Sequence, residues 1–142
     1  METKRYFVAL CCLLSSIFAF CQNVKRPDSY NYSRGLEAVQ KEQYQEALEY
    51  LNKEVAENPK NGYAFVWIAV IRDYGEEYGR ALTAVELALK NLPKKDGDYM
   101  AFAYRTRAGV HLHMEDTIKA LADYTAAIKF NPRNDDLYEK RA

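Results

Sequence analysis

A phrase of seventeen residues occurs three times in this 142-residue chain, and no other feature constrains the fold as strongly. The copies QYQEALEYLNKEVAENP, EYGRALTAVELALKNLP and DTIKALADYTAAIKFNP occupy residues 43–59, 77–93 and 116–132. In each copy an alanine is followed by mainly apolar residues one, four and eight positions later. Because these offsets fall on one side of a helix with 3.6 residues per turn, each copy predicts a helix with a single buried face.

All three copies end on the same residue type and follow a segment that predicts another helix. Each ends on a proline, which lacks the N–H that would continue a helix: Pro59, Pro93 and Pro132. Twelve positions before each alanine stands a small residue, in a segment that predicts a preceding helix: Gly35, Ala69 and Ala108. The unit is therefore helix, turn, helix and proline, and it measures 34 residues from Pro59 to Pro93. Residues 94–100 lengthen the next interval to 39 residues, as a longer turn or an extended start of the next helix.

A helix pair that recurs at 34 residues resembles the tetratricopeptide repeat (TPR) family, over about residues 28–142. The resemblance implies an all-α fold, a right-handed α-α superhelix (solenoid) of about three helix pairs whose first helices line a concave groove. The expected repeats cover about residues 28–61, 62–95 and 101–134, and residues 135–142 match the opening of the third. This first helix of a fourth repeat is either a terminal cap or part of a longer array.

The first repeat departs from the family pattern at two positions. Asn31 stands where a large aromatic residue is usual, and Glu54 stands where alanine is usual. We interpret this polar copy as a cap, whose outer face has no neighbouring repeat to pack against.

The first 21 residues indicate a secretory signal peptide. Two basic residues precede an apolar run from Phe7 to Phe20, about fourteen residues long, which is shorter than the roughly 20 that a membrane-spanning helix needs. We expect cleavage after Cys21, an exported protein (periplasmic or extracellular), a linker at residues 22–27 and no membrane insertion of the mature chain. Two alternatives stay open: a lipid anchor on Cys21, which the bulky Phe20 disfavours, and retention of the segment as an uncut anchor.

Charge and cysteine content limit the classes of function. The chain has 20 basic and 20 acidic side chains, so its net charge gives no attraction for nucleic acid or acidic lipid. All three cysteines precede residue 22, so the mature chain would contain neither a disulfide nor a thiol. Its stability must then come from packing.

The histidines and carboxylates of the chain do not have the spacing of a metal site or a catalytic site. His111 and His113, the only histidines, point about 200° apart on a helix, so one is expected at the packing face and the other towards groove or solvent. The sequence KKDGD at residues 94–98 lacks the remaining ligands of a calcium loop and predicts a turn. No phosphate-binding loop or nucleophile elbow is present. We therefore predict that the protein is not an enzyme and uses no metal or cofactor.

The TPR resemblance also implies where a partner would lie, along the first helix of each repeat. The family's groove positions, transferred to this chain, predict an aromatic strip with a cation at one side: Tyr32, Tyr63, Trp67, Tyr74, Phe102 and Arg105. Rigid rings of this kind are typical anchors of binding hot spots. The chaperone-tail subfamily holds a terminal carboxylate with lysines and asparagines, and this chain has other residues at those places: Tyr32, Leu36, Trp67, Phe102 and Thr106. A receptor for chaperone tails is therefore disfavoured.

These features predict an exported module for protein–protein interaction, which binds an extended segment or a helix of a protein partner. Alternatively, the chain is the exported sensory or scaffolding part of a larger protein with an enzymatic domain beyond Ala142. A structural spacer without a ligand is the third alternative, since aromatic residues at helical spacing often belong to the core.

Overall fold

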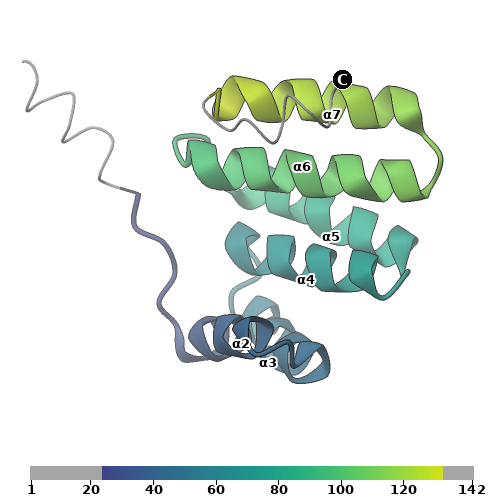
Figure 1. Cartoon of the computed structure of the whole chain (residues 1–142). Helices are drawn as coiled ribbons and strands as arrows, with labels where there is room; N and C mark the ends of the chain where they lie inside the picture. The colour runs from purple at the N-terminus through teal and green to yellow at the C-terminus, as the bar shows by residue number, and fades with distance from the viewer. Residues whose placement is uncertain (1–23, 133–142) are drawn as a thin grey trace, which may run out of the picture.

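The computed structural model describes residues 24–132, which form six helices and no strand (Figure 1). In chain order they are α2 (Tyr30–Gln40), α3 (Tyr44–Glu57), α4 (Gly62–Tyr74), α5 (Tyr78–Asn91), α6 (Gly97–His113) and α7 (Thr117–Phe130). The expected signal peptide, Cys21 and the start of a fourth repeat lie outside the described residues.

The helices form three pairs, α2/α3, α4/α5 and α6/α7, which stack on one another (Figure 1). Between the pairs, α3 packs on α4 and α5 packs on α6, while α4 also contacts α6 directly. The first helices of the pairs thus follow one another along the stack. This is the all-α arrangement that the repeated phrase predicted.

The alanines that recur in the phrase lie where paired helices meet. Ala47 and Ala81 have no exposed surface, and Ala120 is 1% exposed. Leu51, four residues after the first of them, is also fully buried and packs against Gly35 of the preceding helix; a Cβ on that glycine would lie 2.7 Å from the leucine Cγ. Small residues therefore let the two helices of a pair approach closely. The expected buried face is confirmed at the alanines and four residues after them, but one residue after the alanine it is wrong in the third copy, where Leu121 is 48% exposed.

The turn inside each helix pair has the same backbone geometry. The second of its three residues has a positive φ of 58° at Glu42, 61° at Glu76 and 62° at Glu115. In every turn the N–H of this glutamate and the next N–H bond to carbonyls in the last turn of the preceding helix, at 2.8 to 3.0 Å. This is the Schellman arrangement, in which glycine is usual because a Cβ is strained at positive φ. The three helices therefore end in the same regular way, although glutamate replaces the glycine by which this ending is usually recognised in a sequence.

Helix α6 takes up much of the longer interval before the third repeat. It has 17 residues against 13 in α4, and it begins at Gly97, ahead of residue 101 where the third repeat was expected. The Asp96 side chain caps it by accepting the Tyr99 N–H at 3.3 Å. A Cβ on Gly97 would lie 2.7 Å from the Phe130 carbonyl oxygen. Because Gly97 has no side chain, the C-terminal end of α7 can pack closely against the start of α6.

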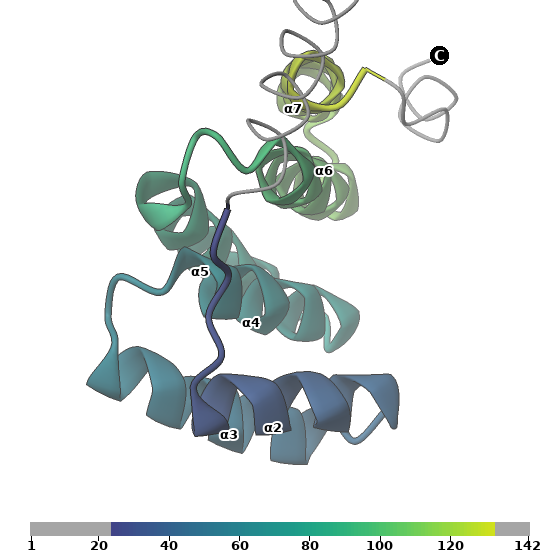
Figure 2. The ribbon, with the colours of Figure 1, turned by 90° about the vertical axis from the view of Figure 1, so that its left-hand side faces the viewer.

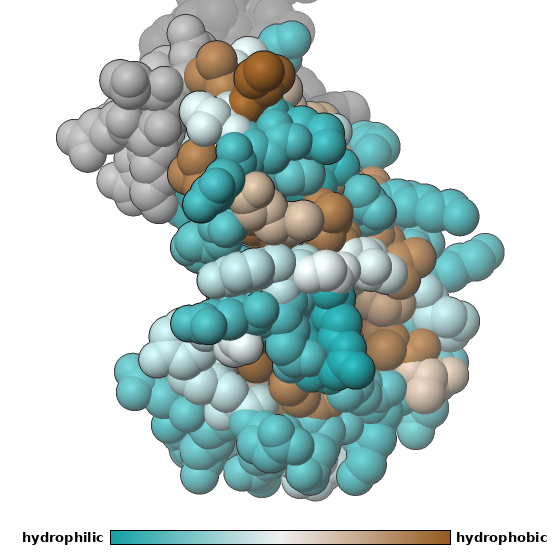
Figure 3. Space-filling view, turned by 90° about the vertical axis from the view of Figure 1, so that its right-hand side faces the viewer, coloured by the Kyte–Doolittle hydropathy of each residue, from teal (hydrophilic) through white to brown (hydrophobic). Residues whose placement is uncertain are grey.

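On the face seen in Figure 3, several apolar groups lie next to one another at the right of the view, and others appear singly among polar groups. Within residues 24–132, no helix is both long enough and apolar enough to cross a bilayer.

Candidate functional site

The first two turns of the first helices bring four rings together, which we call the ring cluster: Tyr32, Trp67, Tyr99 and Phe102. The Tyr99 hydroxyl lies 3.2 Å from the hydroxyl of Tyr32 and accepts the indole N–H of Trp67 at 3.3 Å. The ring of Phe102 makes edge-on contacts with Trp67 and Tyr99, with centroids 5.1 and 5.9 Å apart. The ring cluster thus ties α2, α4 and α6 together.

Two predicted groove residues, Tyr32 and Tyr63, lie in the hydrophobic core, with 3% and 5% of their surface exposed. Tyr99 contacts both: its hydroxyl lies 3.2 Å from that of Tyr32, and its ring centroid is 4.7 Å from that of Tyr63. Burial raises the pKa of both phenols, so their hydroxyls stay protonated and can donate hydrogen bonds. The sequence analysis did not predict Tyr99 as a site residue. It could have been found from its position three residues before Phe102, because residues at this spacing lie on the same side of a helix.

The other four predicted groove residues divide into a contiguous group and an outlier. Trp67, Phe102 and Arg105 are half-buried, and the Arg105 guanidinium lies 5.4 Å from the centre of the Phe102 ring. We call these three the Trp67–Phe102–Arg105 surface. Tyr74 is 73% exposed at the other end of α4, where its ring centroid is 5.0 Å from that of Tyr44. The structure therefore brings together three of the six predicted residues at an accessible place.

Residues 24–29, which we call the leading segment, run from α2 towards the start of α6 along one edge of the stack (Figure 2). Arg26 anchors the segment to α6 by donating from Nε and Nη2 to the two oxygens of Asp96, at 2.9 and 3.1 Å. Its guanidinium also lies 4.8 Å from the centre of the Tyr99 ring and 3.7 Å from Asp98. The sequence predicted a linker at residues 22–27, and Arg26 joins the described part of it to the third repeat.

Asp96 presents Arg26 with a carboxylate that other groups hold in place. It is 3% exposed, and its oxygens also accept the Tyr63 hydroxyl at 3.0 Å and the Tyr99 N–H at 3.3 Å. Burial alone would raise the pKa of Asp96, but the Arg26 guanidinium and these two donors outweigh burial and lower it. The carboxylate is therefore ionised at neutral pH and favours a cation in front of it.

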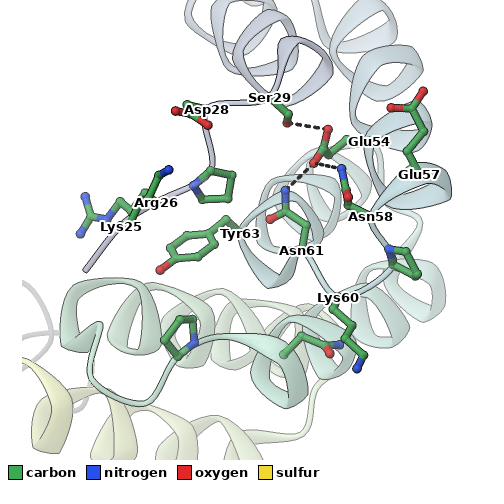
Figure 4. A pocket seen from close by; sticks show the side chains of 14 residues that line it. Lys25, Arg26, Asp28, Ser29, Glu54, Glu57, Asn58, Lys60, Asn61 and Tyr63 are labelled. Atoms are coloured by element: carbon green, nitrogen blue, oxygen red, sulfur yellow. Dashed lines mark hydrogen bonds between the residues drawn. The ribbon is translucent and has the colours of Figure 1, made fainter. Parts of the chain in front are cut away.

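A second buried carboxylate, Glu54, holds the other end of the leading segment. It is 1% exposed and accepts the Ser29 hydroxyl at 2.6 Å and the side-chain amides of Asn58 and Asn61 at 3.0 and 2.9 Å (Figure 4). Burial would raise the pKa of Glu54, but these three donors and the backbone N–H of Tyr32 lower it. The interpretation of Glu54 as part of the outer face of a cap is therefore wrong, because its side chain points inward and joins three segments.

A pocket of about 620 Å³ opens between the leading segment and the turn from α3 to α4 (Figure 4). Its lining includes side chains of both charges, among them Lys25, Lys60, Asp28 and Glu57. The lining of the pocket does not include Trp67, Phe102 or Arg105, so this pocket and the predicted groove are different places. The leading segment therefore spans a gap between its two anchors instead of packing down along its whole length.

The two histidines point to opposite sides of α6, as the sequence predicted. His113 is exposed, and its Nδ1 lies 2.8 Å from an oxygen of Asp73 on α4. His111 is 8% exposed and lies 3.7 Å from Asp123, which accepts two hydrogen bonds from Arg107 at 2.8 and 2.7 Å. From residue 24 to residue 132, no group of three or more His, Cys, Asp or Glu side chains is placed to hold a metal ion.

The stacked helix pairs match a known architecture. No family model and no curated protein matches this sequence. Among solved structures, the chain is similar to the first TPR of Spaghetti (RPAP3) bound to HSP90 peptide SRMEEVD, with a TM-score of 0.69 and 18% identity. The match covers 78% of this chain and 84% of that chain. The chain has a TPR-like fold. At 18% identity this likeness concerns the fold, so the function of the TPR-like domain has to be argued from its own side chains.

Proposed function

We propose that this TPR-like domain is a non-enzymatic interaction module, which binds an extended segment of a protein partner against α2, α4 and α6. The observation that carries the proposal is the Trp67–Phe102–Arg105 surface. There, two rings in edge-on contact lie beside a guanidinium, and all three side chains are only half-buried. Aromatic and arginine side chains dominate binding hot spots, because they combine large contact area with a polar group.

The chemistry of the surface suggests what the partner presents. Arg105 makes no ion pair with any residue between 24 and 132, so its guanidinium is available to a carboxylate or a backbone carbonyl of the partner. Trp67 and Phe102 would contact an apolar side chain of the same segment. An extended shape is supported by the leading segment, which already lies extended beside these helices, and by the related fold of RPAP3, which is described as bound to a peptide.

Two further parts of the proposal rest on different observations. A non-enzymatic role is supported by the buried carboxylates Glu54, Asp96 and Asp123, each of which is occupied by structural hydrogen bonds. Export is supported by the signal-peptide pattern of residues 1–21.

Selection from a library of displayed peptides tests this function, with the full chain and its variants as immobilised baits. We expect enriched peptides to bind the parent chain and to lose binding to Trp67→Ala and Arg105→Glu. Arg80→Glu is the matched control, since it makes the same charge change on a side chain that is 73% exposed on α5. Thermal melts followed by circular dichroism establish that each bait is folded.

The spacer alternative makes the opposite prediction. It is favoured by Tyr32 and Tyr63, which support the core although the family pattern places them in the groove. A spacer would enrich no peptide, or would enrich peptides that bind the parent and all three variants equally. Either result would reject the proposed module.

A further inference from the structure

We propose that Asp96, Asp98 and Tyr99 form a receptor for an arginine side chain, which we call the arginine site. A partner's extended segment that carries an arginine would bind there by displacing Arg26 of the chain's own leading segment. The inference rests on the proposed function and deepens it, because it names a side chain that the partner must supply.

The contacts of the arginine site match the distinctive properties of a guanidinium. Both oxygens of Asp96 accept from Arg26, at 2.9 and 3.1 Å, in the forked geometry that arginine alone provides. The planar group also lies 4.8 Å from the centre of the Tyr99 ring, and the Asp98 carboxylate adds negative charge at 3.7 Å. A lysine ammonium has neither the fork nor the flat face, so the site should favour arginine over lysine.

Asp96 and Asp98 are held in place by hydrogen bonds that do not involve Arg26. Asp96 is fixed by the Tyr63 hydroxyl and the Tyr99 N–H, and Asp98 accepts the side-chain amide of Asn131 at 3.1 Å. If Arg26 left, Asp96 would keep its hydrogen bonds with Tyr63 and Tyr99 but lose the cation that balances its charge. Because a buried charge without a partner is unfavourable, the vacated site would favour another guanidinium.

Arg26 can be displaced because the leading segment is held at few points. Its side chain is 47% exposed, and ion pairs with this much solvent contact contribute little to stability. Among the described residues, Arg26 and Ser29 are the only members of the segment whose side chains make hydrogen bonds. The pocket of about 620 Å³ lies beneath the stretch between them. Release of Arg26 would therefore leave the Ser29–Glu54 bond as a hinge.

The arginine site is continuous with the proposed binding surface. Tyr99 forms its floor and also belongs to the ring cluster, where it contacts Phe102 at 5.9 Å and accepts the Trp67 N–H at 3.3 Å. One extended segment with an arginine near an apolar residue could thus contact both places at once.

The test measures binding of two fluorescent peptides to the full chain by anisotropy. One peptide has the sequence of residues 24–29, VKRPDS, and the other, VKKPDS, has lysine in place of the arginine. The proteins are the parent, Arg26→Ala, Arg26→Ala/Asp98→Asn and the control Lys25→Ala. Asp98 is 75% exposed and does not cap α6, so its replacement should leave the fold intact, which a thermal melt verifies.

We expect Arg26→Ala to bind VKRPDS on the order of tenfold more tightly than the parent, because an internal ligand at high effective concentration no longer occupies the site. Arg26→Ala should bind VKKPDS about tenfold more weakly than VKRPDS, since lysine lacks the bidentate fork. The added Asp98→Asn change should weaken binding of VKRPDS, and Lys25→Ala should behave like the parent.

Absence of VKRPDS binding to Arg26→Ala, equal binding of both peptides, or equal affinity of Arg26→Ala and the parent would overturn the arginine site. If the selected library peptides then still depended on Trp67 and Arg105, the proposed function would stand without it. If VKRPDS bound Arg26→Ala as expected while library peptides ignored Trp67 and Arg105, the arginine site would stand and the wider surface would be rejected.

Discussion

Replacing Glu54 with alanine would give the first repeat the residue that the later copies carry at this position, Ala88 and Ala127. We nevertheless expect the change to destabilise the domain. The Asn61 amide, in a residue that is 8% exposed, would lose its acceptor, which costs ~1–3 kcal/mol. The vacated space would add ~1 kcal/mol. Asn58 is exposed and can turn to water, so the free energy of unfolding should fall by roughly 2–4 kcal/mol.

Glu54→Gln is the matched control, because it keeps the volume and one acceptor oxygen. That oxygen can accept both asparagine amides, and the Ser29 hydroxyl can rotate to accept from the new amide. This variant should lose less than ~1 kcal/mol at neutral pH. Urea unfolding followed by circular dichroism measures all three proteins.

The pH dependence of the difference between the parent and Glu54→Gln isolates the carboxylate. The folded state lowers the pKa of Glu54, so its contribution is present above the unfolded value of about 4.3 and is lost as the pH falls through the lower folded value. The stability difference should therefore shrink on acidification below about pH 4. If Glu54→Ala were as stable as the parent, the view that this carboxylate organises the first repeat would be refuted.

Four other substitutions test separate features. Glu42→Gly should raise the free energy of unfolding by ~1 kcal/mol, because it relieves a φ of 58° in an exposed turn; a loss in urea unfolding would contradict the strain. Gly79→Ala, with no atom within 4 Å of the added Cβ, should stabilise α5 by ~0.5–1 kcal/mol. Gly97→Ala should cost ~1–3 kcal/mol, since its Cβ would lie 2.7 Å from the Phe130 carbonyl oxygen; equal melting temperatures would contradict this contrast. Trp67→Ala should cost ~1–3 kcal/mol, less than the ~3–5 of a fully buried ring, and a larger loss in urea unfolding would place Trp67 in the core.

The helix pairs were predictable because their determinants lie close together in the sequence. Ala47 and Leu51 are one helical turn apart, and the spacing between them recurs in phase in the other copies, so the buried face could be read without tertiary information. The Schellman turns were not visible, because Glu42 and its equivalents stand where glycine is usual.

The candidate site was predictable only in part, because its decisive contacts join distant positions. Tyr63 was expected on an open surface, but Tyr99 covers its ring and Asp96 accepts its hydroxyl, and both come from the irregular stretch before the third repeat. Arg26 stands in a stretch that looks like a linker, and its partner follows 70 residues later. Periodicity within one repeat carries no information about such pairs.

The contacts of Tyr32 and Arg26 also bear on how the domain unfolds. In a simple solenoid each repeat touches only its neighbours, so terminal repeats can fray while the middle persists, as in a one-dimensional Ising chain. Here the Tyr32 hydroxyl meets that of Tyr99 at 3.2 Å, so the first and third helix pairs are coupled directly, and the exposed Arg26–Asp96 pair adds little to this coupling. Loss of either end would weaken the other, which favours a single cooperative unit whose amides exchange together.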